Sequence, residues 1–206
     1  MKIVTTVKVW DLAVRVFHWS LVIFFAIAYL TGDELDTVHA WSSYVIIALI
    51  LFRLLYGFVG SKYARFSDFI KSPETVWTYI KQLLNRSPKH YLGHNPAAGW
   101  MVVLLLLSLA MSSWSGLKAY AEEGHGPLAA TDFSVIQTAY ADGDDDHERN
   151  KNTVSDGEEY WEELHEISVN LTLLLIFIHV TGVIVSSWLH KENLVKAMLT
   201  GKKHLK

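Results

Sequence analysis

The feature that most constrains this chain is a long apolar run near its C-terminus, at residues 163–189. A run of this length crosses a bilayer as a single helix. It carries His165 near its start and His179 fourteen residues later. At 1.5 Å and about 100° per residue, the two imidazoles lie about 21 Å apart along the helix and within about 40° of the same face. Ionisable residues inside membrane spans are costly, so we interpret both histidines as functional. Their spacing suits a helix that serves two separate redox centres.

Three further apolar runs predict three more membrane spans, so the fold class is an all-α integral membrane bundle of four transmembrane helices. Hydrophobic residues make up 51% of the 206 residues, which favours one small membrane domain over residues 1–206. The first run lacks a convincing small-residue cleavage site, and we interpret it as a retained span rather than a signal peptide. The predicted spans occupy residues 13–31, 38–60, 97–116 and 163–189.

The connections between the spans are polar. A short acidic turn follows the first span, and a basic segment at residues 61–96 follows the second. Within this segment, residues 72–85 predict a short amphipathic helix capped by Ser72, and we expect its apolar side to lie on the membrane surface. An acidic loop is expected at residues 117–162, parts of it mobile.

Charge placement predicts the orientation. The N-terminal segment, residues 53–89 and the C-terminal tail hold 15 of the 18 Lys and Arg residues. By the positive-inside rule, both termini and the 61–96 segment are cytoplasmic, and the acidic loop is periplasmic. The chain is therefore expected to be a multi-pass protein of a bacterial inner membrane.

This topology sorts four histidines into two pairs at matching depths. His18 lies near the cytoplasmic end of the first span, as His179 does in the fourth, and His39 and His165 both lie near the opposite surface. Two sites with two imidazoles each, one per leaflet, would form an electron path across the membrane.

A single histidine in a span can simply form a hydrogen bond between helices, but four at paired depths are harder to explain in this way. With 0 Cys, thiolate iron–sulfur clusters and covalently attached haem are excluded. Zinc usually takes four ligands at one depth. Two histidines per site with aromatic neighbours fit a haem with axial imidazoles better; these neighbours are Phe17, Trp19, Trp41 and Phe177.

Arg53 also lies within a span, fourteen residues after His39 and therefore on a similar face. Either it binds a haem propionate or a quinone head group, or it extends its side chain to the membrane surface. We expect solvent exposure for the remaining histidines, in the 61–96 segment, the acidic loop and the tail: His90, His94, His125, His147, His190 and His204.

Seven segments in order resemble the prokaryotic cytochrome b561 family, which includes the b-type cytochrome subunits of nickel–iron hydrogenases. They cover nearly the whole chain apart from the acidic loop. They are WDLAVRVFHW at 10–19, VHAW at 38–41, RLLYGFVGSKYARFSDF at 53–69, GHNPAAG at 93–99, LHE at 164–166, HVTGV at 179–183 and HKENLVKAMLTGKK at 190–203. The resemblance implies a four-helix bundle with two haem b groups, whose axial ligands correspond to His18, His39, His165 and His179. It also implies electron exchange between the quinone pool and a redox partner.

The acidic loop departs from the shorter members of this family and bears on the partner. Some relatives look like superoxide:quinone oxidoreductases, for which a positive surface would attract the anion. The acidic residues here instead favour a basic protein, such as a c-type cytochrome. They are Asp142, Asp144, Asp145, Asp146, Glu148, Glu158, Glu159, Glu162 and Glu163.

We therefore expect a transmembrane dihaem b-type cytochrome that transfers electrons between the quinone pool and a periplasmic redox protein. We expect an electron-transfer protein rather than a stand-alone oxidoreductase, and no nucleic-acid partner. The alternatives are the membrane cytochrome b subunit of a nickel–iron hydrogenase or other dehydrogenase, a superoxide:quinone oxidoreductase, and a haem-free anchor or divalent-metal carrier.

Overall fold

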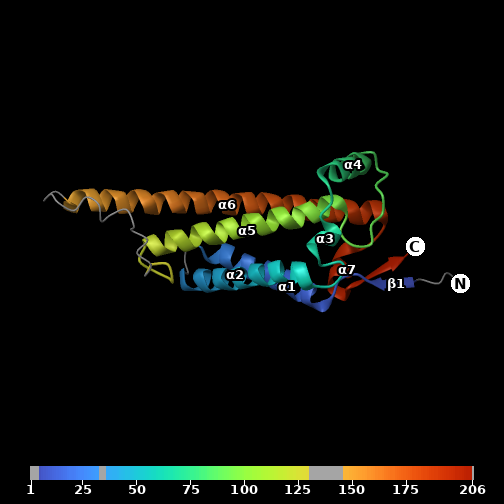
Figure 1. Ribbon diagram of the computed structural model, residues 1–206, viewed down its shortest axis with the longest axis horizontal. Coiled ribbons are helices and arrows are strands. Elements are labelled where there is room, and N and C mark those ends of the chain that lie inside the picture. The colour runs from blue at the N-terminus through green and yellow to red at the C-terminus, as the bar shows by residue number, and fades with distance from the viewer. Residues whose placement is uncertain (1–4, 33–35, 130–145, 206) are drawn as a thin grey trace. The chain divides into compact units, whose positions relative to one another are not determined.

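The computed structural model describes residues 5–32, 36–129 and 146–205, and most of them are helical (Figure 1). Four helices are long and apolar enough to cross a membrane, which confirms the four predicted spans. They are α1 (Leu12–Thr31), α2 (Asp36–Val59), α5 (Pro96–Glu122) and α6 (Asp146–His190).

The prediction of a loop over residues 117–162 is wrong at both ends of this segment. Helix α5 continues to Glu122, and α6 begins at Asp146, well before the apolar run that marks the span. The physical reason is that hydropathy marks where a helix leaves the membrane, whereas backbone hydrogen bonds continue wherever no helix breaker intervenes. The acidic residues at 142–145 lie outside the described residues.

The chain divides into two compact units. The first comprises Met1–Leu106 and Leu174–Lys206, and the second comprises Leu107–Leu173. The first unit therefore contains α1, α2, the beginning of α5, the end of α6 and the smaller elements, while the second contains the end of α5 and the beginning of α6. The single domain over residues 1–206 stays a prediction.

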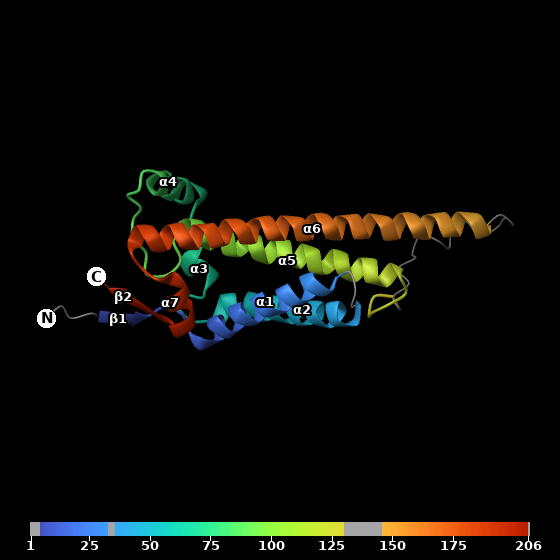
Figure 2. The ribbon, with the colours of Figure 1, turned by 180° about the vertical axis from the view of Figure 1, so that it is seen from behind.

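In the first unit, α1 and α2 lie side by side in both views (Figures 1 and 2). The buried side of α2 follows a helical spacing of three and four residues, at Ser42, Ile46, Ile50, Arg53 and Gly57. On the other side of the same helix, large apolar side chains are exposed, as expected of a surface that faces lipid. Examples are Leu55, Phe58 and Val59.

Two short helices follow α2 in the first unit. Helix α3 (Phe66–Phe69) leads into α4 (Pro73–Leu84), which confirms the helix predicted for residues 72–85. Ser72 accepts a hydrogen bond from the Thr75 amide at 3.4 Å, and proline occupies the first helical position, where its missing N–H costs nothing. Trp77 and Leu84 remain exposed, while Tyr79 is buried.

The two ends of the chain are joined by a two-stranded antiparallel ribbon, for which the sequence offers no signal. Strand β1 (Thr5–Lys8) pairs with β2 (Lys202–Leu205) after the short helix α7 (Leu194–Thr200). Gly201 makes this connection possible, because it adopts a left-handed φ of 78° and its carbonyl accepts the amides of Val9 and Trp10. The ribbon therefore holds residues 5–8 beside residues 202–205.

Asp11 holds the start of α1 against the end of α2. Its carboxylate accepts the Val14 amide at 2.8 Å as a helix N-cap, and it also accepts hydrogen bonds from the hydroxyls of Tyr56 and Ser61. Burial alone would raise the pKa of Asp11, but the hydrogen bonds from Ser61, Val14 and Tyr56 outweigh burial and hold this pKa below its ordinary value.

We predict that Asp11→Ala lowers the free energy of unfolding by about 1 kcal/mol for the lost cap. Asp11→Asn keeps a capping oxygen but removes the charge, so it isolates the pH dependence. Since the folded pKa of Asp11 is depressed, the stability that its charge contributes is present above the unfolded pKa of about 4 and is lost as pH falls through the folded value. Thermal unfolding of detergent-solubilised protein, followed by circular dichroism, should show the advantage of wild type over Asp11→Asn shrinking below about pH 4. An advantage that stays constant down to pH 3 would contradict this account.

Candidate functional site

Two of the predicted site residues, His18 on α1 and His179 on α6, belong to the first unit, and an electrostatic interaction links their imidazoles. Both rings are half-buried, and the Nδ1 atom of His18 is shielded from solvent with no hydrogen-bond partner among the described residues. The Trp19 indole meets the His18 ring edge-on, with 5.3 Å between the ring centroids. His18 therefore lies in a half-buried, aromatic environment.

His39 lies in the first turn of α2, in the first unit, and its orientation is fixed by the end of α1. Its Nδ1 atom lies 2.9 Å from the carbonyl oxygen of Ala28. This carbonyl lies in the last turn of α1, where it also accepts a longer hydrogen bond from the Thr31 hydroxyl at 3.4 Å. Because a carbonyl only accepts, Nδ1 carries the proton, and Nε2 is the nitrogen with a lone pair for a metal.

His165 shows the same arrangement in the second unit. Its Nδ1 atom lies 2.9 Å from the carbonyl oxygen of Ser112 on α5, and 3.4 Å from the hydroxyl of Ser115. Small polar residues line this helix pair: the hydroxyls of Ser108 and Thr172 are 2.6 Å apart. Such small residues let two membrane helices approach closely. Again Nδ1 is the protonated nitrogen and Nε2 the one able to bind a metal.

Both proposed histidine pairs stay predictions. His18 and His179 belong to the first unit, whereas His39 belongs to the first unit and His165 to the second.

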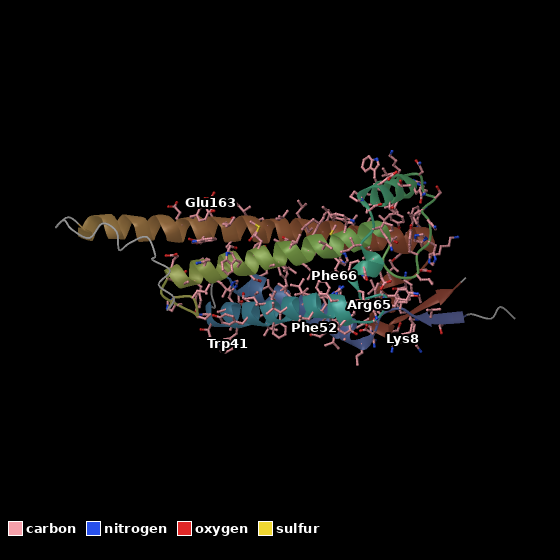
Figure 3. All side chains as sticks on the ribbon, in the orientation of Figure 1. Lys8, Trp41, Phe52, Arg65, Phe66 and Glu163 are labelled. Atoms are coloured by element: carbon pink, nitrogen blue, oxygen red, sulfur yellow. The ribbon has the colours of Figure 1, made fainter. Side chains whose placement is uncertain are left out.

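Arg53 is buried, with only 3% of its area exposed. Its Nη2 atom donates to the carbonyl of Ala64 at 3.0 Å, and its guanidinium lies 4.9 Å from the ring centroid of Phe66 (labelled in Figure 3) and 5.7 Å from that of Phe69. Its Nη1 atom is shielded and has no hydrogen-bond partner among the described residues. A buried guanidinium with an unused donor is suited to bind an anionic oxygen.

His94 is a residue whose placement the sequence did not predict, because a polar segment indicates solvent exposure by default. In the structure its ring packs against Trp10 and Phe69, at centroid distances of 4.5 and 4.6 Å. Burial lowers the pKa of His94 to about 3, and the nearby charges of Arg53 and Lys203 act in the same direction. His94 is therefore neutral at physiological pH. The glycines and aromatic residues near His94 in the sequence were the signal that could have predicted this placement.

The aromatic residues expected beside the histidines divide into two groups. Phe17 is buried at 8% exposure, and the indole nitrogen of Trp19 is shielded from solvent. Trp41, near the start of α2 (Figure 3), and Phe177 are instead 67% and 70% exposed. A residue's place on the helix face, and not its closeness in sequence to a histidine, decides how exposed its side chain is.

The fold and these residues define a multi-pass helical membrane protein that carries imidazoles within its spans. The family model for prokaryotic cytochrome b561 matches residues 9–201, and the chain belongs to this family. Members of the family are b-type cytochromes, so haem b and electron transport are what membership implies.

Two relatives of this chain have a more specific description than the family as a whole. The chain is 22% identical to a probable Ni/Fe-hydrogenase B-type cytochrome subunit of Bradyrhizobium diazoefficiens, over 98% of this chain and 87% of that protein. It is 23% identical to a protein of the same description from Azotobacter chroococcum, over 96% of this chain and 88% of that protein. No solved structure matches the chain.

The residues present fit haem b. Metal-bound histidines almost always donate their second ring N–H to a carbonyl, a carboxylate or water, as the Nδ1 atoms of His39 and His165 do here. The unpartnered Nη1 atom of Arg53 offers a donor of the kind that a propionate accepts. Among the described residues, no group of three or more His, Cys, Asp or Glu could hold a bare metal ion.

We predict that Gly116→Ala disturbs haem binding through His165. A Cβ atom at position 116 would lie 2.9 Å from Cε1 of His165, so the ring must shift and its hydrogen bond to Ser112 must weaken. The substitution favours the helix by up to about 1 kcal/mol, so the fold should persist. The haem content by pyridine haemochrome should fall to about half that of wild type if His165 serves one of two haems.

The matched control is Gly157→Ala, also in helix α6, where the added Cβ meets only the Glu122 carboxylate at 3.8 Å. This variant should keep the wild-type haem content. Equal haem contents in the two variants would show that the His165 ring has no part in haem binding.

Proposed function

We propose that this protein is a dihaem b-type membrane cytochrome in which His18 and His179 ligate one haem and His39 and His165 ligate the other. The observation that carries the proposal is the pair of hydrogen bonds from Nδ1 to backbone carbonyls, at His39 and at His165. These bonds leave Nε2 as the iron ligand in both cases. The electrostatic interaction between His18 and His179 supports the other pair.

When bound, the two haems supply reversible one-electron carriers. The residues of the chain would hold these haems in place. The helices place the imidazoles, the apolar side chains exclude water, and Arg53 presents its unused Nη1 donor to an anionic oxygen such as a propionate. A dry, fixed setting of this kind tunes a reduction potential through ligand identity and burial.

We propose that electrons pass between a quinone that reacts near the cytoplasmic side of a bacterial inner membrane and a protein partner on its periplasmic side. The ribbon that joins the two ends of the chain agrees with both termini lying on one side, and the excess of Lys and Arg there favours the cytoplasm. The haem held by His18 and His179 would then lie nearer the cytoplasm.

The partner that we propose is a nickel–iron hydrogenase. The relatives described as hydrogenase cytochrome subunits match over nearly their whole length, which favours this alternative over a freely diffusing c-type cytochrome. The acidic carboxylates on the early part of α6, such as Glu159 and Glu163, fit a partner with a basic surface in either case.

We predict that the purified protein carries two haems per chain and that His18→Ala and His39→Ala each remove one component of its redox-titrated visible spectrum. Each change deletes one axial ligand of a different haem, so the other component should remain. His125→Gln is a suitable control, because this exposed imidazole contacts only Glu123 among the described carboxylates. Loss of neither component, or of both in a protein that is still folded, would refute the pairing.

We also predict that a nickel-containing hydrogenase co-purifies with the protein from native membranes in mild detergent and stays bound in about 1 M salt, where the Debye length is only about 3 Å. A c-type cytochrome held by charge alone should dissociate under these conditions. A third outcome, superoxide oxidation by the protein alone that speeds up as salt screens the acidic surface, would favour the oxidoreductase alternative.

A further inference from the structure

A group of titratable side chains lies beyond the four spans, where the segment after α6 meets the segment before α5. The Nε2 atom of His90 is 2.8 Å from one carboxylate oxygen of Glu192, and the Nζ atom of Lys203 is 3.6 Å from the other. Lys203 is buried, whereas the His90 side chain is 42% exposed. The proposed haem sites use none of these three residues.

Lys203 and Tyr91 hold this group in place. The ammonium of Lys203 donates to the carbonyl of Tyr91 at 3.4 Å as well as pairing with Glu192. Burial lowers the pKa of Lys203, and the carboxylate of Glu192 opposes this shift. The pair thus fixes the carboxylate beside an imidazole that is open to solvent.

A cavity of about 330 Å³ connects His90 with His94. Its polar lining includes Lys62, Asp68 and Lys71, and it is also lined by Phe69, whose ring lies near both the His94 ring and the guanidinium of Arg53. A cavity of this size and polarity has room for about ten water molecules. His90 and His94 therefore line one polar cavity, and Phe69 is common to this cavity and to the surroundings of Arg53.

We propose that His90 is a proton-exchange residue for quinone chemistry, with Glu192 as its positioning residue and this cavity as the route for protons. The inference rests on the proposed function, because it requires a quinone that reacts on the side of His18 and His179. Reduction of a quinone to a quinol takes two electrons, which the proposed haems would supply, and two protons, one onto each quinone oxygen. Oxidation of a quinol releases the same two electrons and two protons.

The chemistry of His90 suits this task. Histidine is the side chain whose ordinary pKa allows it to gain and lose a proton between pH 5 and 8. Here the ring is partly exposed to solvent, lines the cavity, and has its Nε2 atom within hydrogen-bonding distance of a carboxylate. The charged and titratable groups that face it are Glu192, Lys203, Lys62, Lys71, Asp68 and His190, whose ring centroid lies 5.2 Å from that of His90.

If the group of His90, Glu192 and Lys203 served only to hold the C-terminal strand in place, a different result would be expected. The clamp needs Lys203, Glu192 and the carbonyl of Tyr91, all of which a His90 substitution leaves in place. His90→Gln therefore separates proton exchange from folding.

The test uses the fully reduced holoprotein, mixed in a stopped-flow instrument with either a water-soluble ubiquinone analogue or ferricyanide. Ferricyanide takes one electron and no proton. We expect His90→Gln to slow haem oxidation by the quinone about tenfold, less than the full contribution of a general acid because cavity water offers another path. Oxidation by ferricyanide should be unchanged, and added imidazole should restore the quinone rate. Glu192→Gln, which keeps a hydrogen-bonding oxygen and loses the charge, should slow the quinone reaction by a smaller factor.

The control is His125→Gln, which removes an exposed imidazole that also lies near a carboxylate, 3.8 Å from Glu123. A wild type that reduces no quinone would end the proposed function. A wild type that does so, with His90→Gln as fast as wild type or slowed equally towards both oxidants, would overturn the proton-exchange role alone.

Location gives a second, independent readout. In His90→Cys the introduced thiol stands in a chain with 0 Cys, so a charged, membrane-impermeant maleimide should label it in inside-out vesicles and not in right-side-out vesicles, as mapped by mass spectrometry. The opposite pattern, or protection in both, would also overturn the proposal.

Discussion

An imidazole inside a bilayer must find a partner for its N–H within the protein, and the arrangement of this chain depends on that constraint. His39 uses the carbonyl of Ala28 at the end of α1, and His165 uses the carbonyl of Ser112 on α5. Each bond joins one helix to another and at the same time fixes which nitrogen faces a metal. The close approach at His165 is also why position 116 is a glycine, because a Cβ there would meet the ring. The same hydrogen bonds therefore pack the helices together and orient the histidine rings.

Outside the spans, polar contacts organise the other end of the first unit. Asp11 links the start of α1 to the end of α2, Gly201 links the N-terminal strand to the C-terminal one, and Lys203 links this ribbon to the segment before α5. Together these contacts cover Arg53 and His94, which a simple extended tail would leave open to water. The basic tail therefore does more than orient the chain in the membrane. It also forms part of the structure around the haem site proposed for His18 and His179.

The sequence predicted what depends on local pattern. Apolar runs gave the four spans, and Ser72 with Pro73 gave the start of α4. It failed where partners are distant in the chain: the ribbon pairs residues about 200 positions apart, and His94 is buried by Trp10 and Phe69 rather than by its neighbours in sequence. Periodicity reports one face of one element, so it cannot show that a polar loop folds inwards. For the same reason Arg53 could be placed on the face of His39, but whether it reached the membrane surface could not be decided.

The histidines of this chain show how environment divides one side chain among three kinds of work. Within the spans, a carbonyl that accepts the Nδ1 proton directs the lone pair of the ring to Nε2, which is the nitrogen proposed as the ligand in His39 and His165. His94 instead packs against Trp10 and Phe69, and burial lowers its pKa to about 3. His90 lies beside the Glu192 carboxylate with its side chain 42% exposed, which is the setting proposed for proton exchange. The contacts around each ring, and not the residue type, therefore separate the proposed roles of these histidines.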